Sequence, residues 1–392
     1  MARTNSVNFT GANQYPMASA GTDIFKKEDV QTLAKSVDLH DHSTGLGLPA
    51  NMGAIAAGSI DGSKLVDGTV TSAKILDGTI QSVDIAAAGI ANDRLGPDVA
   101  RANQLTNPGF EVWSRGNGPF TGTNFSADRW AGSPQGTDTL SVSKDTTNVD
   151  TSSGSLAAAA CTFTLGTGAG ATQLYQTLKP SEGNQLSNRT ISLSVRVRTS
   201  TANAVRLGVF NGSATTYSAY HTGDGTWQTL TITVTVVNAA AAVNVGVYFA
   251  ASCTAYVDNA CLVVGSQAAN YVPLHPAEDL ARCLRYYQRF ANSASGAYMA
   301  QGQAFSATQA MVASPLKAPF AVTPTLTISA ASDFGLLNAT AGAAPACSSL
   351  VANSISGHLL TMLAVASGLV AGNATMVQGL NTNAWFALEG NP

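Results

Sequence analysis

A short stretch in the middle of the chain carries residue types that sugar-binding proteins use. Residues 215–227 read TTYSAYHTGDGTW, which includes Tyr217, Tyr220, His221 and Asp224. An aromatic ring can pack against the face of a pyranose while neighbouring polar side chains hold its hydroxyl groups. We therefore predict an exposed loop that binds carbohydrate through these four residues. The alternative is that the aromatic rings pack into a core, as they usually do beside a strand.

The same sequence offers little for catalysis. A glycosidase needs two carboxylates about 5 to 9.5 Å apart, whereas candidates such as Asp224 and Asp258 are isolated and no acidic motif is clustered. No G-x-S-x-G elbow, P-loop or HExxH motif occurs in the chain. We therefore expect a protein that is not an enzyme and that requires no cofactor.

Cysteine and histidine spacing does not predict a disulfide framework or a zinc site. The five cysteines are odd in number and lack CxxC or Cys/His spacing, so we interpret them as buried apolar residues. The HDHS motif at residues 40–43 leaves two interpretations open. Two histidines per chain could bind a metal on a trimer axis, or they could make ordinary hydrogen bonds in a turn.

Composition excludes further classes of protein. Charged residues make up 11% of the 392 residues and the net charge is −3, so we expect no nucleic-acid partner. The N-terminus does not resemble a secretory signal, and no 18-residue apolar run occurs, so we expect no membrane insertion. The length indicates two to four domains.

Residues 49–100 contain a repeat with a period of five. Nine aliphatic residues follow this interval: Ile55, Ile60, Leu65, Val70, Ile75, Ile80, Ile85, Ile90 and Leu95. The DGS and DGT turns between them predict short strands. One such chain buries too little apolar surface to offset an ordering cost of about 1 to 2 kcal/mol per residue. We therefore predict that the nine residues form the core of an intertwined trimeric shaft; stacked repeats on one chain and a flexible linker are the alternatives.

Residues 101–275 predict an antiparallel β-sandwich. Eight strand-like runs are separated by Gly, Asn, Asp and Ser: TLSVSKD, ACTFTLG, TQLYQTLK, RTISLSVRVRTS, AVRLGVFNG, TWQTLTITVTVV, AVNVGVYFAA and AYVDNACLVVG. The alternation in ISLSVRVRTS is typical of a strand with one buried face. Trp130 and Trp227 are interpreted as core residues.

The regions on either side of the sandwich indicate two short helices and a second β-rich part. One helix is predicted in the N-terminal 48 residues and another from Pro276, with Leu280, Leu284 and Tyr287 as its apolar stripe. Beyond that helix, residues 291–392 contain only three charged residues, Lys317, Asp333 and Glu389. So little charge predicts a β-rich domain whose surface is largely buried between subunits.

Two motifs carry a resemblance to a known family. The stretch QLTNPGFEVWSRGNGPFTGTNFSADRW opens the predicted sandwich, and EDLARCLRYYQRF follows it. Together with the DGT repeat, they resemble tail-fibre and receptor-binding structural proteins of tailed bacteriophages, which contain a carbohydrate-binding-module-like jelly roll. The motif positions here are Asn107, Gly109, Phe110, Glu111, Trp113, Asp128, Arg129 and Trp130.

The resemblance also implies a metal site. In jelly rolls of this kind, the Glu of the G-F-E motif and an Asp near the last strand often bind a structural calcium ion. The corresponding residues here are Glu111 and Asp258, and calcium accepts such oxygen ligands. The alternative is that these acids cap turns or pair with Arg129.

The resemblance and the residues together predict an elongated, mainly β homotrimeric fibre. Its parts would be an attachment region (1–48), the repeat shaft (49–100), the carbohydrate-binding-like sandwich (101–275), and a helix with a β-rich tip (276–392). We expect a tail fibre of a virion, assembled in the host cytoplasm, that joins other virion proteins by its N-terminus and binds host surface glycans through its C-terminal domains. The alternatives are a head fibre, decoration or adaptor protein without receptor binding, and a tailspike depolymerase.

Overall fold

The computed structural model describes residues 8–9, 16–17, 65–66, 68–76, 78–81, 84, 102–168, 171–292, 294–338 and 344–391. The chain divides into two units, Met1–Ile85 and Ala86–Pro392. The HDHS motif, the predicted N-terminal helix and five of the nine shaft residues (Ile55, Ile60, Ile85, Ile90 and Leu95) lie outside the described residues. The predictions made for them stay predictions.

The first unit contains one short strand pair and part of the repeat. Strands β1 (Asn8–Phe9) and β2 (Pro16–Met17) pair antiparallel. In the described part of the repeat, the predicted short strands are wrong. A 3-10 helix, η3 (Ser72–Lys74), lies between two turns at Gly68 and Gly78 instead.

The two turns repeat the same contacts ten residues apart. Thr69 donates its hydroxyl to the Val66 carbonyl over 2.7 Å, and Thr79 does the same to Leu76 over 2.6 Å. Both glycines have positive φ angles, which Gly adopts without steric cost. This local bonding favours turns over extended backbone, so the DGT spacing produces turns without strands. Four shaft residues, Leu65, Val70, Ile75 and Ile80, are between 39% and 57% exposed in the single chain.

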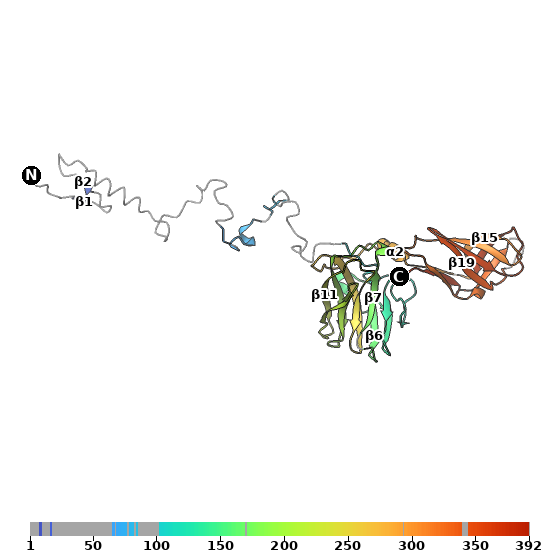
Figure 1. The fold of residues 1–392 in the computed structure, drawn as a ribbon, viewed down its shortest axis with the longest axis horizontal. Helices are drawn as coiled ribbons and strands as arrows, with labels where there is room; N and C mark the ends of the chain where they lie inside the picture. Colours follow the sequence, from blue (N-terminus) through green and yellow to red (C-terminus); the bar gives the residue numbers. More distant parts are fainter. Residues whose placement is uncertain are drawn as a thin grey trace, which may run out of the picture. The chain divides into compact units, whose positions relative to one another are not determined.

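In the second unit, residues 102–265 form the predicted antiparallel sandwich (Figure 1). A five-stranded sheet has the order β10-β9-β12-β7-β4, and a six-stranded sheet has the order β11-β8-β13-β6-β5-β3. The strands are β3 (Phe120–Thr121), β4 (Ala131–Ser133), β5 (Thr139–Asp145), β6 (Ala158–Thr164), β7 (Thr172–Leu178), β8 (Thr190–Thr199), β9 (Val205–Phe210), β10 (Thr215–Tyr220), β11 (Trp227–Thr235), β12 (Val243–Phe249) and β13 (Cys253–Val264). Short 3-10 helices η6 (Thr151–Ser153) and η7 (Pro180–Glu182) lie in the connections.

All eight predicted strands are present, and the two inner sheet faces form one hydrophobic core. Alternate residues of β8, from Ile191 to Val197, are at most 1% exposed. Trp130 is fully buried, as predicted, whereas Trp227 is half-buried and stands outside this core. All five cysteines are free and buried, as expected.

The second helix is shorter than predicted. Helix α2 spans Pro276–Leu284, and the YQRFA sequence that follows forms strand β14 (Tyr287–Ala291). The predicted apolar stripe is therefore wrong: Leu280 is exposed and Tyr287 belongs to the strand. Pairing of β14 with β22 (Trp385–Glu389), about 100 residues later, overrides the local helical spacing.

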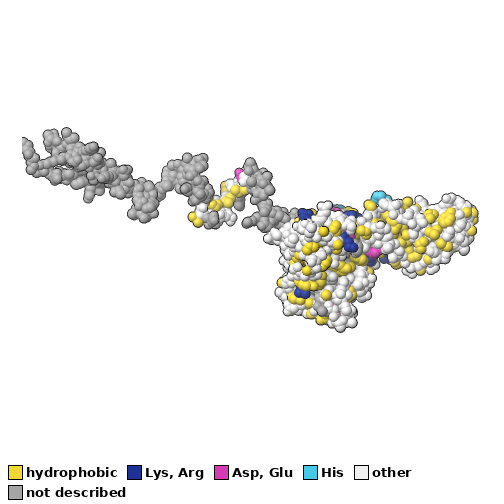
Figure 2. Space-filling model, in the orientation of Figure 1, with side chains coloured by type: hydrophobic (Ala, Val, Ile, Leu, Met, Phe, Trp, Pro, Cys, Tyr) yellow, Lys and Arg dark blue, Asp and Glu magenta, His cyan; other side chains and the backbone are white. Residues whose placement is uncertain are grey.

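The C-terminal part is β-rich and has its own core around Phe334, Leu360 and Phe386. Its three-stranded sheet has the order β14-β22-β17, and its six-stranded sheet has the order β18-β21-β15-β16-β20-β19. The remaining elements are β15 (Tyr298–Ala304), β16 (Gln309–Pro315), β17 (Thr325–Ile328), η8 (Ala331–Asp333), β18 (Phe334–Asn338), β19 (Ser349–Ser356), β20 (Leu359–Val365) and β21 (Ala374–Gly379). Uncharged side chains cover most of the face of this part seen in Figure 2. Among the described residues, no helix is long and apolar enough to cross a membrane.

Candidate functional site

Asn107, the first residue of the recognised motif, holds the start of the sandwich together. Its backbone has φ 52°, a left-handed conformation that Asn tolerates better than most residues. Its side-chain Nδ2 donates to the carbonyls of Val112 (2.8 Å) and Asp128 (3.1 Å), and its Oδ1 accepts from the Val112 N–H. Trp130 donates its indole N–H to the Asn107 carbonyl over 2.9 Å. These bonds give the motif a structural role.

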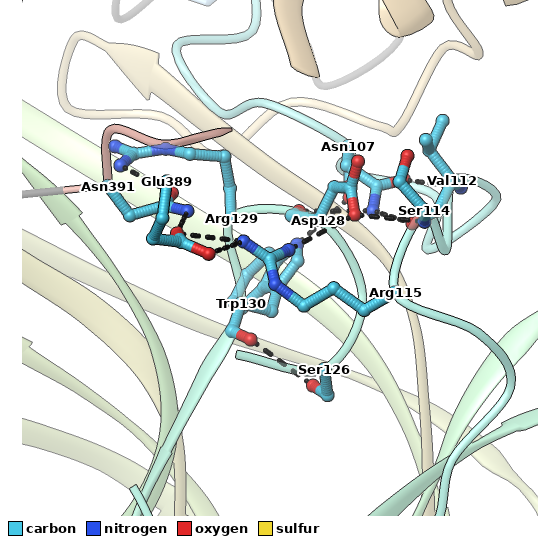
Figure 3. Close-up of polar contacts among 10 residues, drawn as sticks. All are labelled: Asn107, Val112, Ser114, Arg115, Ser126, Asp128, Arg129, Trp130, Glu389 and Asn391. Carbon is cyan, nitrogen blue, oxygen red and sulfur yellow. Dashed lines mark hydrogen bonds and ion pairs between the residues drawn. The ribbon is translucent and has the colours of Figure 1, made fainter. Parts of the chain in front are cut away.

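Two arginines, the partly buried Arg115 and the buried Arg129, connect this motif to the sequence after α2 (Figure 3). Arg115 lies 3.3 Å from Asp128 and 2.6 Å from Glu389, and its guanidinium lies 3.7 Å from the centre of the Tyr287 ring. Burial raises the pKa of Asp128, and the charge of Arg115 opposes that shift. Arg115 therefore bridges the sandwich and the last strand of the C-terminal part.

The second arginine makes a corresponding set of contacts. Arg129 lies 3.2 Å from Glu182, with side chains 2% and 0% exposed, and 3.9 Å from the centre of the Tyr286 ring. We call the ion pairs of Arg115 and Arg129 the junction. The two recognised motifs meet there, because ADRW supplies Arg129 and RYY supplies both tyrosines.

The predicted calcium residues, Glu111 and Asp258, both accept hydrogen bonds from backbone N–H groups. Glu111 Oε1 accepts from the backbone N–H of Leu156 over 2.7 Å. Asp258 accepts from the backbone N–H groups of Asp150 and Asn259 over 3.1 and 2.7 Å. N–H groups cannot coordinate a cation, and the described residues hold no group of three or more His, Cys, Asp or Glu side chains suited to a metal. Calcium binding at Glu111 and Asp258 stays a prediction.

A cavity of about 700 Å³ opens beside Glu111, and Trp113, Tyr271, Asp279 and Leu280 also line it. Its two acids bond within the chain, because Asp279 Oδ1 accepts from the Asn107 N–H over 2.9 Å and Glu111 is occupied as above. One oxygen of each acid is therefore held by the backbone of the sandwich.

The outer surface of the five-stranded sheet differs from these regions. Alternate side chains of β9 and β12, such as Val205, Leu207 and Val245, point into the core. The residues between them therefore face outward. We call this surface the aromatic face and define it by Tyr175, Arg206, Tyr217, Tyr220 and Tyr248, with Gln173 and Asn244 beside them.

Strand register places these residues in two neighbouring rows. The first row runs Tyr217, Gly208, Gly246, Tyr175, and the second runs Tyr220, Arg206, Tyr248, Gln173. Gly208 is required here because a Cβ at this position would overlap the ring of Tyr248. The centre of the face is thus a tyrosine ring lying across a glycine.

Arg206 lies among the rings of this face. Its guanidinium is 3.6 Å from the centre of the Tyr217 ring and 4.9 Å from that of Tyr220. Tyr217 meets Tyr248 edge to face at 5.1 Å. Burial, and then the neighbouring Tyr217, raise the pKa of Tyr248 to about 12, so this phenol is neutral at physiological pH.

The four residues predicted to bind sugar do not all come together. Tyr217 and Tyr220 lie on the aromatic face, in strand β10 and not in a loop. His221 is fully buried, with Nε2 3.1 Å from the Val197 carbonyl. Asp224 accepts from the N–H and hydroxyl of Thr226, which stabilises a turn. His221 and Asp224 therefore have structural contacts.

Sequence reasoning missed Tyr175, Arg206 and Tyr248. A sequence pattern that could have indicated them is the alternation in TQLYQTL, VRLGVF and VNVGVYF. In these strands Tyr, Arg and Gly occupy positions between buried residues. Strand pairing, which no local pattern reveals, was needed to bring them together.

Comparisons with solved structures give alignments of low identity and low TM-score. No protein-family model matches the chain, and no curated protein matches it. A CBM22-1 xylan-binding domain from Paenibacillus barcinonensis Xyn10C aligns with 14% identity and a TM-score of 0.30, over 44% of this chain and 100% of that one. TmCBM61, solved with β-1,4-galactotriose, aligns with 16% identity and a TM-score of 0.27, over 42% and 99%. The tailspike protein 4 domain of bacteriophage CBA120 aligns with 15% identity and a TM-score of 0.28, over 42% and 21%.

Proposed function

We propose that the protein binds glycans through the aromatic face of its sandwich and acts as a fibre component of a bacteriophage virion. The observation that carries the binding role is the aromatic face, where tyrosines share one outward surface with Arg206. Tyr217 is 37% exposed, so its ring is available to a ligand. Aromatic surfaces with a few polar groups suit sugar rings and their hydroxyls.

Binding without cleavage follows from the chemistry of the same face. Hydrolysis of a glycoside needs two carboxylates flanking the bond. The outward residues of β7, β9, β10 and β12 include none, since they are Tyr, Thr, Gln, Arg, Asn, Phe and Gly. We therefore propose a non-enzymatic role in host attachment.

The trimer and the virion belong to the proposal as well. Apolar side chains in the repeat, and others in the C-terminal part such as Tyr298, Phe305 and Val370, are more than a third exposed in one chain. Three chains would cover such groups, and three copies of the face would raise the avidity for a glycan. The motif resemblance supports attachment to the particle by the N-terminus, with assembly in the host cytoplasm.

The binding role can be tested on the full-length protein with an array of immobilised bacterial lipopolysaccharides and capsular polysaccharides. We expect wild-type binding to at least one glycan and a loss of tenfold or more in the Tyr217→Ala/Tyr175→Ala double variant, because each lost ring contributes about 1 kcal/mol. Tyr256→Ala, which removes a half-buried tyrosine of β13 on the other sheet, is the control. Undiminished binding by the double variant would contradict the proposal.

A map of the intact particle tests the virion role separately. We expect the N-terminus at the particle and the aromatic face free. A sandwich whose aromatic face is covered by another virion protein would favour a decoration or adaptor protein.

A further inference from the structure

We infer that the glycan bound by the aromatic face carries carboxylate groups, and that Arg206 selects them. This inference rests on the proposed glycan binding and adds the chemical class of the ligand. Its basis is the charge of Arg206, which the surrounding residues hold in place but do not neutralise.

Four other described arginines are neutralised by ion pairs with carboxylates. Arg115, Arg129, Arg196 and Arg282 each lie within 3.3 Å of a carboxylate oxygen. No ion pair joins Arg206 to any acid among the described residues, and its guanidinium lies over the uncharged rings of Tyr217 and Tyr220. A positive charge therefore remains on the face.

The groups around Arg206 do not cancel that charge. The residues that face it are phenols, Tyr217 and Tyr220 from β10 and Tyr248 from β12. Tyr248 is neutral because its pKa is raised. No outward residue of the four strands is acidic, so the face as a whole is positive and aromatic.

Three polar side-chain atoms of this face have no hydrogen-bond partner in the chain. Buried polar atoms without a hydrogen-bond partner include Arg206 Nε, Gln173 Oε1 and Asn244 Oδ1. Such atoms cost free energy unless a partner satisfies them. Gln173 lies two strands from Arg206 in the same row, at roughly 10 Å for a strand spacing of about 4.8 Å. Arg206 and Gln173 are both half-buried, so this row presents a guanidinium at one position and an amide at another.

The geometry of a guanidinium favours a carboxylate. Its planar fork donates two parallel N–H groups to the two oxygens of a carboxylate. Stacking on two tyrosine rings fixes the plane of this fork and reduces the entropy lost on binding. An acidic sugar could place its ring against tyrosine and its carboxylate on Arg206.

The test uses pairs of polysaccharides that differ only in charge. The probes are polygalacturonate, alginate, hyaluronate and colominic acid, each compared with its carboxyl-reduced, neutral form by calorimetry on the full-length protein. We expect at least one acidic polymer to bind tenfold or more tightly than its reduced form, and Arg206→Gln to remove that difference. Arg206→Lys keeps the charge but loses the fork, so we expect an intermediate affinity.

Arg189→Gln is the control, because Arg189 is exposed at the start of β8 on the other sheet and the variant has the same net charge as Arg206→Gln. Melting curves confirm that each variant is folded. Equal binding of acidic and reduced forms, or full discrimination by Arg206→Gln, would overturn the inference. Tyrosine-dependent binding of neutral glycans alone would overturn it and leave the proposed function intact. Absence of binding both here and on the lipopolysaccharide and capsule array would overturn both.

Discussion

Arg129 at the junction and Arg206 on the aromatic face both lie over tyrosine rings, but only Arg129 forms an ion pair with a described acid. The Arg129 guanidinium is 3.9 Å from the Tyr286 ring and 3.2 Å from Glu182. Arg206 has the rings of Tyr217 and Tyr220 and no described carboxylate. A neutralised arginine stabilises the fold, whereas a fixed arginine without an acid is available to an external anion.

Unpartnered polar atoms alone do not separate the two regions. Arg129 Nε and Glu182 Oε1 lack a hydrogen-bond partner, as does Arg206 Nε. The difference lies in the charge balance, because the buried junction contains both signs and the aromatic face contains one. The comparison therefore predicts different consequences for the loss of each arginine.

The largest effect is expected at the junction. Arg129→Ala leaves Glu182 as a buried uncompensated charge and should lower the free energy of unfolding by about 3 to 5 kcal/mol. Arg206→Ala removes contacts with two rings and should cost only about 1 kcal/mol. Urea unfolding followed by tryptophan fluorescence measures both, because Trp130 is fully buried in the sandwich core.

The double variant Arg129→Ala/Glu182→Ala completes a double-mutant cycle and is the control for the ion pair. It removes both charges, so it should be more stable than the sum of the two single variants predicts. Equal losses for Arg129→Ala and Arg206→Ala would mean that ion pairing does not distinguish the two regions.

Asp150 and Asp258 allow the same comparison for negative charges, because only Asp150 forms an ion pair with a described arginine. Burial acts to raise the pKa of Asp150, but hydrogen bonds from Arg196 and Ser152 outweigh it and lower the pKa. Burial raises the pKa of Asp258 to about 7, and no ion pair joins it to an arginine among the described residues. The native state therefore binds the Asp258 proton more tightly than the unfolded chain does.

This difference predicts opposite pH dependences. The contribution of Asp258 to stability is fully present below pH about 4 and is lost as the pH rises to about 7, by on the order of 4 kcal/mol at most. Asp258→Asn should remove this decrease when urea unfolding is measured from pH 4 to pH 8. Asp150→Asn should instead remove stability that is present at neutral pH and lost in acid. Parallel curves for the wild type and Asp258→Asn would show that Asp258 does not titrate in this range.

Much of the fold could be predicted from the sequence because its strands have locally readable patterns. All eight expected strands of the sandwich are present, and the aliphatic residues from Ile191 to Val197 are buried as expected, although Ser192 and Ser194 between them are buried as well. Local spacing failed where distant pairing decides the structure, as for Tyr287–Ala291, which pairs with Trp385–Glu389. It also failed in the repeat, where bonds within each turn favour a 3-10 helix.

The residues of the aromatic face were harder to predict from the sequence than the strands. Tyr217 and Tyr220 were found because they are close together in sequence, but His221, in the same stretch, is buried. Arg206 and Tyr248 are 42 residues apart and become neighbours only through the register of β9 and β12. A binding face that crosses strands is defined by pairing, which a single strand's pattern does not contain.

Substitutions in the repeat are expected to have the smallest effect on the stability of the sandwich. Here the comparison is between exposed aliphatic residues of the repeat and buried ones of the sandwich. Ile75 and Ile80 are 39% and 57% exposed in one chain, whereas the aliphatic residues of the sandwich strands lie in its core. If three chains bury these repeat residues, Ile75→Asp/Ile80→Asp places charges without partners in the trimer core. The trimer dissociation constant, measured by analytical ultracentrifugation, should rise more than 100-fold, while the unfolding free energy of the sandwich changes by less than about 0.5 kcal/mol. Ser72→Asp/Gln81→Asp adds the same charge at exposed polar positions of the same repeat and should leave the trimer intact. Equal dissociation constants for the two double variants would contradict a shared shaft core, and the exposed aliphatic residues would then not mark a contact between chains.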